Sequence, residues 1–152
     1  MRASRKLKVL ILISLFFFGN ILTVFPSANS DLLIGTWQNA SGEVRVEIYK
    51  KGHMFFGKLD WLKNPYRNGK PKTDIKNPNP ALRSRPVIGL IIIREFMYEG
   101  NFVWDNGKVY DPDSGNDYSC KLRLLNRNSL EVRGFIAISL IGRTEVWTRI
   151  VK

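Results

Sequence analysis

Residues 43–48 read EVRVEI, in which apolar side chains alternate with charged ones. Successive side chains of an extended chain point to opposite faces, so this stretch predicts a strand with one buried and one solvated face. The same period of two recurs at residues 118–124, 130–133 and 145–150. No segment after residue 30 shows a long apolar stripe at helical spacing. We therefore expect an all-β fold.

Turn-forming residues separate these stretches at intervals of about ten residues. They lie at residues 40–42, 51–53, 99–101, 105–107, 113–115 and 126–128. Gly, Asn and Asp favour such turns because they tolerate the backbone angles that tight turns require. This spacing predicts an antiparallel meander. Closure into a barrel is the arrangement that leaves no exposed edge strand.

Residues 63–86 interrupt the pattern with five prolines. Proline donates no backbone hydrogen bond, so we expect a long loop in place of a regular ladder, with one helical turn at residues 81–84. A hydrophobic strand is expected to resume directly afterwards, at residues 86–93. Loops of this length in a compact domain are usually functional covers or disordered linkers, and the strand that follows favours a cover.

The same loop concentrates the positive charge of the chain. It holds seven basic residues and a single acid, Asp74, whereas the rest of the chain after residue 30 is nearly balanced. We expect Arg83 and Arg85 to contact an anionic group, because guanidinium groups bind carboxylate and phosphate in a bidentate geometry. Lys70 and Lys72 are expected to assist them. The alternative is a solvated loop whose cations serve solubility.

The first thirty residues predict where the protein works. A basic start is followed by an apolar run at residues 9–25 and small residues at 28–30, the pattern of a secretory signal peptide. We expect residues 1–30 to be removed and residues 31–152 to form a single exported domain, with no nucleic-acid partner and no stable membrane insertion. The alternative is that the apolar run remains as a membrane anchor, because its length is at the lower limit for a spanning helix.

Groups suited to catalysis or metal binding are sparse. The single histidine, His53, lies at an expected turn, and the single cysteine, Cys120, lies on the apolar face of an expected strand. Neither a catalytic triad nor a zinc site is predicted from them. Residues 111–117 are rich in Asp, but leucine stands where a calcium loop needs its bidentate glutamate. We therefore expect no metal and no cofactor.

Several motifs resemble a known family. Residues 35–37, Gly-Thr-Trp, are similar to the motif that opens the first strand of lipocalins. The segments that resemble an uncharacterised family of secreted bacterial proteins, the domain of unknown function numbered 2147, are residues 77–86, 110–112, 130–135, 139–144 and 147–149. The resemblance covers residues 34–150. It implies a small lipocalin-like (calycin-like) barrel of about eight strands in the periplasm or outside the cell.

The resemblance also implies roles for individual residues. Lipocalin-like barrels pack the tryptophan of the first strand at their closed end, under a basic side chain from the last strand. Trp37, next to Gly35, matches the first role, and Arg143 or Arg149 matches the second. No activity is established for the family, and the resemblance implies at most a site for a small apolar or amphipathic ligand.

Aromatic side chains complete the candidate site. Trp61, Trp104 and Tyr110 are expected to line a ligand cavity, although filling the core is their alternative role. The preferred hypothesis is a lipocalin-like binding protein for a small hydrophobic or anionic amphipathic ligand, with the basic loop over its mouth.

Two alternatives stay open. One is an interaction protein with a solid core, which docks the loop onto anionic envelope polymers or a protein partner. The other is an enzyme that uses Asp111, Asp113 or Glu145 as acid or base, although we expect no enzymatic activity. The sequence leaves the oligomeric state open.

Overall fold

The structure is a computed structural model that describes residues 29–135 and 144–151. Its strands are β1 (Gly35–Gln38), β2 (Val44–Lys51), β3 (Met54–Leu62), β4 (Tyr66–Arg67), β5 (Lys70–Pro71), β6 (Ile91–Gly100), β7 (Val103–Asp111), β8 (Asn116–Asn126), β9 (Ser129–Phe135) and β10 (Thr144–Ile150). Two short 3₁₀ helices are η1 (Ser30–Leu33) and η2 (Pro80–Leu82). The described ranges hold no helix long and apolar enough to cross a membrane. Most of the expected signal peptide lies outside them.

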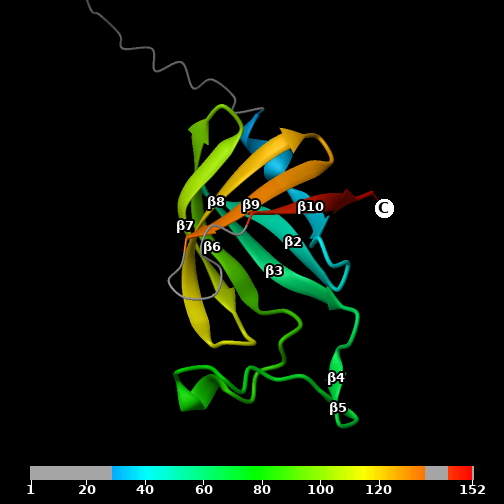
Figure 1. The fold of residues 1–152 in the computed structure, drawn as a ribbon. Coiled ribbons are helices and arrows are strands. Elements are labelled where there is room, and N and C mark those ends of the chain that lie inside the picture. Colours follow the sequence, from blue (N-terminus) through cyan, green and yellow to red (C-terminus); the bar gives the residue numbers. More distant parts are fainter. Residues whose placement is uncertain (1–28, 136–143, 152) are drawn as a thin grey trace, which may run out of the picture.

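Eight of these strands form a closed antiparallel barrel (Figure 1). Each pairs with the next along the chain, except that β3 pairs with β6 across the inserted loop. Pairing of β1 with β10 closes the barrel and places Trp37 opposite Arg149. The all-β barrel expected from the alternating pattern is confirmed, and closure leaves none of the eight strands with a free edge.

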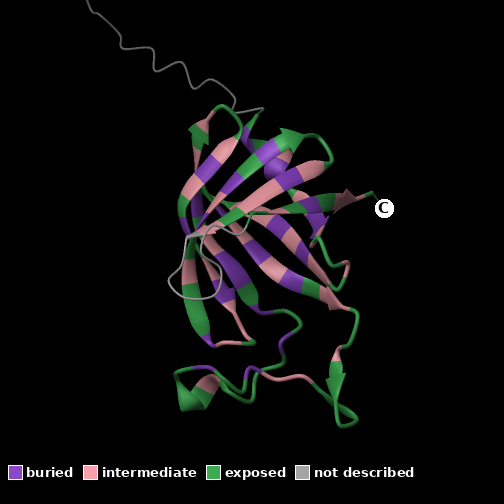
Figure 2. Cartoon of the chain, in the orientation of Figure 1, coloured by how far each residue is buried: buried purple, intermediate pink, exposed green. Residues whose placement is uncertain are grey.

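The interior of the barrel is filled by large apolar side chains. Along β2, Val46 and Ile48 are buried while Glu47 between them is partly exposed, as the period of two requires. Among the residues whose burial is described, four aromatic side chains are fully buried: Trp37, Phe55, Phe96 and Trp104. Burial of each such side chain stabilises the fold by about 1.5–3 kcal/mol. Figure 2 shows the buried residues alternating along the barrel strands, while most of the loop is exposed.

Arg149 on β10 covers the closed end of the barrel. Its guanidinium lies 4.1 Å from the centre of the Trp37 ring and donates a 2.7 Å hydrogen bond to the carbonyl of Ile34. The Trp37 indole donates to the carbonyl of Leu33 at 2.9 Å. A Cβ at Gly35 would lie 2.5 Å from an Arg149 nitrogen, so glycine makes room for this contact. Arg149 thus occupies the position that the lipocalin resemblance implied; Arg143 lies outside the described residues.

The expected turn at residues 105–107 is wrong, because β7 continues through it as a bulge. The register of β7 against β8 shifts between Trp104 and Gly107, and Asn106 has a φ of 64°. A Cβ at Gly107 would lie 2.2 Å from the Phe96 ring. Asn and Gly here bend a strand and leave room for an aromatic ring. Because the same residue types also form turns, the sequence does not show which of the two structures they adopt.

The strand expected at residues 86–93 begins later, at Ile91. Val87 and Leu90 are buried, but they belong to an irregular segment that contacts β3. Leu59 donates to the carbonyl of Leu90 at 2.9 Å, and its own carbonyl accepts from Gly89 at 2.7 Å. A continuous apolar run indicates burial without showing whether the backbone is a strand.

The proline-rich loop also contains more regular structure than expected. β4 and β5 form a short hairpin in which Arg67 lies opposite Lys70. The turn between them is Asn68-Gly69, with φ values of 52° and 74°. Positive φ at both central residues is typical of the tight hairpin turn that Asn-Gly favours. The expected helical turn is present nearby as η2.

Candidate functional site

A cavity of about 510 Å³ lies at the open end of the barrel, where β3 leads into the loop and β7 turns into β8. We call it the mouth cavity. Apolar side chains that line it include Val44, Leu59, Leu62, Ile92, Val109 and Trp147. They come from β2, β3, β6, β7 and β10, so the cavity is formed by the convergence of barrel strands. Its volume lies within the roughly 300–1,000 Å³ of small-molecule sites.

Charged side chains of both signs surround the mouth cavity. The loop contributes Arg67, Lys72 and Lys76, which all line it. The end of β7, the β7–β8 turn and β10 contribute the carboxylates of Asp111, Asp113 and Glu145. The lining is therefore apolar with a mixed charged border, and its positive side is the loop.

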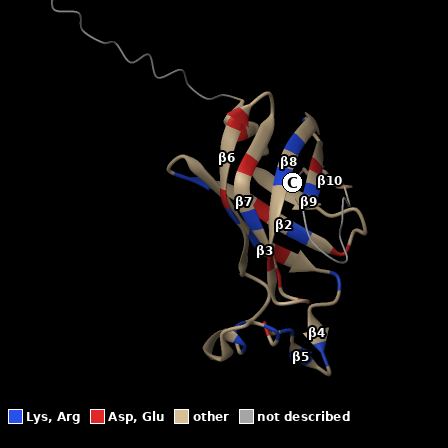
Figure 3. Ribbon diagram, turned by 60° about the vertical axis from the view of Figure 1, so that its left-hand side comes forward, with Lys and Arg blue, Asp and Glu red and all other residues tan. Residues whose placement is uncertain are grey.

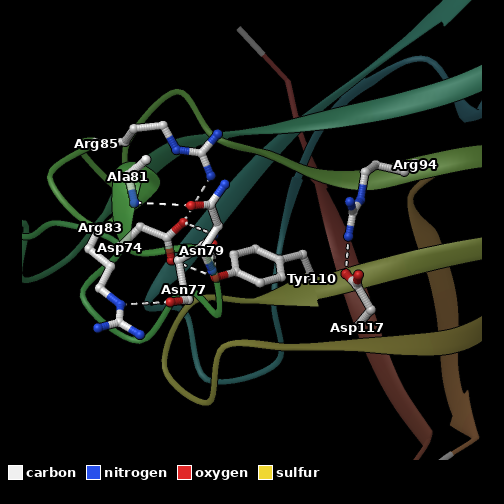
Figure 4. Close-up of polar contacts among 9 residues, drawn as sticks. All are labelled: Asp74, Asn77, Asn79, Ala81, Arg83, Arg85, Arg94, Tyr110 and Asp117. Carbon is white, nitrogen blue, oxygen red and sulfur yellow. Dashed lines mark hydrogen bonds and ion pairs between the residues drawn. The ribbon is translucent and has the colours of Figure 1, made fainter.

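The loop is anchored to the barrel by the buried carboxylate of Asp74 (Figure 4). Asp74 is 0% exposed and accepts hydrogen bonds from Tyr110 at 2.6 Å, Asn77 at 2.8 Å and Arg85 at 3.0 Å. The Asn77 amide also donates to the Tyr110 hydroxyl at 3.1 Å. Because Tyr110 lies on β7, this network connects the loop to the barrel wall.

The network favours the ionised form of Asp74. Burial by itself raises the pKa of this carboxyl, but hydrogen bonds from Tyr110, Asn77 and Arg85, with the charge of Arg85, outweigh it and lower the pKa below its ordinary value. Burial raises the pKa of Tyr110, and the hydrogen bond to Asp74 raises it further. Tyr110 is therefore a neutral donor and Asp74 a charged acceptor near neutral pH.

Further contacts fix the segment around η2. The Arg83 Nε donates to the carbonyl of Asn77 at 2.8 Å, and the Asn79 side chain accepts from the backbone of Ala81 at 3.0 Å. A Cβ at Gly115, which has a φ of 77°, would lie 2.0 Å from the carbonyl oxygen of Lys76. The loop therefore packs directly against the β7–β8 turn.

A second cavity, of about 710 Å³, lies on the outside of the barrel next to the anchor network. Its lining includes Leu82, Ile88 and Ile91, together with Arg85 and Arg94. Arg94 forms an ion pair with Asp117, and Arg85 pairs with Asp74. Both arginines of this outer cavity thus already have carboxylate partners within the chain.

The structure separates the four cations that the sequence analysis grouped together. Lys72 lines the mouth cavity, and Arg85 lines the outer cavity. Lys70 lies in the β4–β5 hairpin, and neither it nor Arg83 lines either cavity. Arg83 donates to the carbonyl of Asn77 and Arg85 pairs with Asp74, and their expected joint role in contacting an anionic group stays a prediction.

The three aromatic candidates are separated as well. Tyr110 lines both cavities and belongs to the anchor network. Trp61 lies under the guanidinium of Arg45, 4.5 Å from the ring centre. Trp104 is fully buried and packs edge to face against Phe55, with ring centres 6.1 Å apart. Trp104 therefore fills the core. Trp147 lines the mouth cavity, although it was not among the predicted site residues.

The remaining chemical groups lie in three different settings. His53 is exposed in the β2–β3 turn. Cys120 is buried, which raises the pKa of its thiol to about 11. The carboxylates considered as acid or base, Asp111, Asp113 and Glu145, all line the mouth cavity.

The importance of Asp74 and Asn77 was not predicted from the sequence. Both are buried polar residues in a segment whose other polar side chains are exposed or partly exposed. The available signal was the presence of one acid among seven bases, since a lone carboxylate in a basic loop has several potential partners. Its main donor, Tyr110, is 36 residues distant and follows from no local pattern.

Comparison with known proteins agrees with this architecture. Residues 35–149 match the model of a family described as "Uncharacterized protein conserved in bacteria (DUF2147)", as the motifs indicated. No curated protein matches the chain. A similar solved structure is protein HP1028 from the human pathogen Helicobacter pylori, described as belonging to the lipocalin family. The TM-score is 0.67 at 23% identity, covering 78% of this chain and 83% of that one. At this identity, the likeness shows the fold alone.

Proposed function

Because the chain belongs to the bacterial family DUF2147 and folds as a lipocalin-like barrel, we propose that it binds a small amphipathic ligand in the mouth cavity. The observation that carries this proposal is the cavity itself, with apolar side chains of five barrel strands beneath a charged border. A ligand with an apolar body and a polar group satisfies both surfaces.

The cavity restricts the size of this ligand. Trp37, Phe55, Phe96 and Trp104 are fully buried in the core, so the ligand occupies the open end and does not extend through the barrel. Its apolar part contacts side chains such as Val44, Leu62 and Ile92. We infer a short acyl chain or a single ring system, because the cavity has the volume of an ordinary small-molecule site.

The border determines how the ligand is oriented. Arg67 and Lys72 contribute positive charge from the loop, whereas Asp111 and Glu145 contribute negative charge from β7 and β10. An anionic group is therefore attracted to the loop cations and repelled by these carboxylates. A ligand with a single carboxylate or phosphate fits this arrangement, with Lys72 as its main contact.

We further propose that the protein acts outside the cytosol, as a binding protein without an enzymatic reaction. The basic and apolar beginning of the chain supports export, because it has the pattern of a signal peptide. A carrier outside the cytosol needs no nucleotide cofactor, and the ligand is held by burial and charge alone.

Calorimetric titration with dodecanoate tests the site. The wild type is expected to bind, and Leu62→Trp is expected to abolish binding because the larger side chain fills the cavity. Lys72→Ala should weaken binding about tenfold, the effect of removing a charged hydrogen-bond donor. Lys70→Ala is the matched control, since it removes the same charge two residues away without touching the cavity, and it should change the affinity less than twofold, as expected for a solvated charge.

Mass spectrometry under non-denaturing conditions gives an independent readout. It should show whether the protein purified from its host carries a ligand that the Leu62→Trp variant lacks. The proposal fails if the wild type carries nothing and binds no dodecanoate, or if Leu62→Trp binds as tightly as the wild type.

A further inference from the structure

Among the described residues, the cations of the loop form fewer ion pairs than those of the barrel wall. On the wall, Lys58, Lys121 and Arg123 each form an ion pair. Among the described residues of the loop, Arg85 alone does so. The loop cations that form no ion pair in the described structure are Lys63, Arg67, Lys70, Lys72, Lys76 and Arg83. Figure 3 shows basic residues clustered around β4, β5 and the adjoining loop.

The same region exposes large apolar side chains. Tyr66, at the start of the β4–β5 hairpin, is 62% exposed, and Ile75 is 48% exposed. The hairpin extends from the barrel as a narrow projection (Figure 1). Exposed aromatic and aliphatic side chains among lysines are unfavourable in water alone, but they match a surface that is charged outside and apolar beneath.

We propose that this loop docks the protein onto an anionic lipid bilayer, with Tyr66 inserted between head groups and the surrounding cations bound to them. Each basic residue near such a surface strengthens binding roughly fivefold, so that several weak contacts add to a useful affinity. A soluble anionic polymer would use the cations equally but would gain nothing from Tyr66 and Ile75. The exposed apolar side chains therefore favour the bilayer.

Docking in this way directs the mouth cavity toward the membrane. Arg67, Lys72 and Ile75 belong both to the basic loop and to the lining of the cavity. A protein held by this loop therefore has its cavity at the lipid surface. The proposal goes beyond ligand binding and stands without it, because the charges and the exposed side chains do not depend on an occupied cavity.

Co-sedimentation with vesicles tests the docking surface. The protein used begins at Asn29, since every strand of the barrel and the whole described core lie after this residue. It should bind vesicles of phosphatidylglycerol and phosphatidylethanolamine at least tenfold more tightly than vesicles of phosphatidylcholine. Sodium chloride should weaken binding, because exposed charges are screened over about 8 Å at physiological ionic strength.

Two double variants of equal net charge show whether vesicle binding depends on the loop surface or only on the net charge of the protein. Lys63→Glu with Lys70→Glu reverses two charges of the loop outside the mouth cavity, and should weaken vesicle binding at least tenfold. Lys51→Glu with Arg127→Glu reverses two exposed charges at the closed end and should change it less than twofold. Equal losses in both variants would overturn the proposal, since attraction would then depend on net charge alone.

Tyr66→Ser separates a bilayer from a soluble polyanion. It should weaken vesicle binding several-fold and leave binding of inorganic polyphosphate unchanged. If Tyr66→Ser has no effect on vesicles and polyphosphate binds as tightly as they do, the loop is a polyanion site and the membrane proposal is wrong. Dodecanoate binding should persist in the Lys63, Lys70 double variant, so failure of docking and failure of ligand binding are distinguishable.

Discussion

The barrel wall and the loop of residues 63–86 differ in what holds them together. The wall encloses fully buried side chains such as Phe96 and Trp104, and several of its surface charges form ion pairs, as in Lys58–Glu47 at 2.8 Å. The loop buries little apolar surface and depends on one buried carboxylate, Asp74. Arg85 and Arg83 take part in this anchoring, whereas the other cations of the loop form no ion pair among the described residues. Stability resides in the wall, and the groups suited to binding reside in the loop.

Among the changes that test this difference between wall and loop, Trp104→Ala is expected to have the largest effect on stability. Removal of a fully buried tryptophan should lower the free energy of unfolding by about 3–5 kcal/mol, because it leaves a large cavity in the core. Denaturant titration followed by circular dichroism measures this loss. Trp61→Ala removes a partly exposed ring that contacts Arg45, and should cost only about 0.5–1 kcal/mol. Similar losses for both would show that the core does not dominate the stability of the barrel.

An intermediate effect, confined to the loop, is expected from Asp74→Ala. The substitution leaves the buried donors of Tyr110 and Asn77 without their acceptor, which should weaken the anchoring of the loop by about 1–3 kcal/mol. Limited proteolysis with trypsin measures it directly, because the loop is rich in lysine. Cleavage within residues 63–86 should accelerate at least tenfold, while the denaturant midpoint of the barrel changes little.

Asp60→Ala provides the matched control for this variant, since Asp60 is an exposed carboxylate on β3 outside the anchor network. It should leave the cleavage rate as in the wild type. Unchanged proteolysis of Asp74→Ala would mean that the loop is held by its other contacts. A large loss of global stability would mean that loop and barrel unfold together.

The smallest effect is expected from lowering the pH, which should weaken the anchoring of the loop by Asp74. Since the pKa of Asp74 is lowered in the folded protein, its contribution is complete above the ordinary carboxyl pKa of about 4 and is lost as the pH falls through the lower folded value. Amide exchange of residues 63–90 should therefore accelerate at acid pH relative to the barrel strands. Asp31 and Asp105 also have lowered pKa values, so only the difference between wild type and Asp74→Asn reports this group. Identical pH profiles for the two proteins would contradict the assignment.

Local patterns predicted the barrel well and the site only in part. Alternation along residues 43–48 and 118–124 follows from which face of a strand is buried, and each segment carries that information itself. The turn expected at residues 105–107 was wrong because Asn and Gly suit a bulge as well as a turn. The hairpin around Asn68-Gly69 was not predicted, because the prolines of the loop indicated an absence of regular structure.

The functional roles of the loop residues depended on partners distant in sequence. Composition showed that the loop is basic, but it did not show that Arg85 is paired with Asp74 while Lys72 faces the cavity. The sequence does not distinguish the roles of Lys70 and Lys72. The structure does, because Lys70 lies in the β4–β5 hairpin and Lys72 lines the mouth cavity.

The sequence by itself determined an all-β chain with one basic, proline-rich insertion, because alternation, turn residues and charge are properties of neighbouring positions. The tertiary structure alone decided which side chains fill the barrel, which anchor the loop and which surround the mouth cavity. These assignments depend on closure of β1 against β10 and on the contact of Asp74 with Tyr110. The partner of each of these side chains lies far away along the chain, and no local pattern encodes such a pairing.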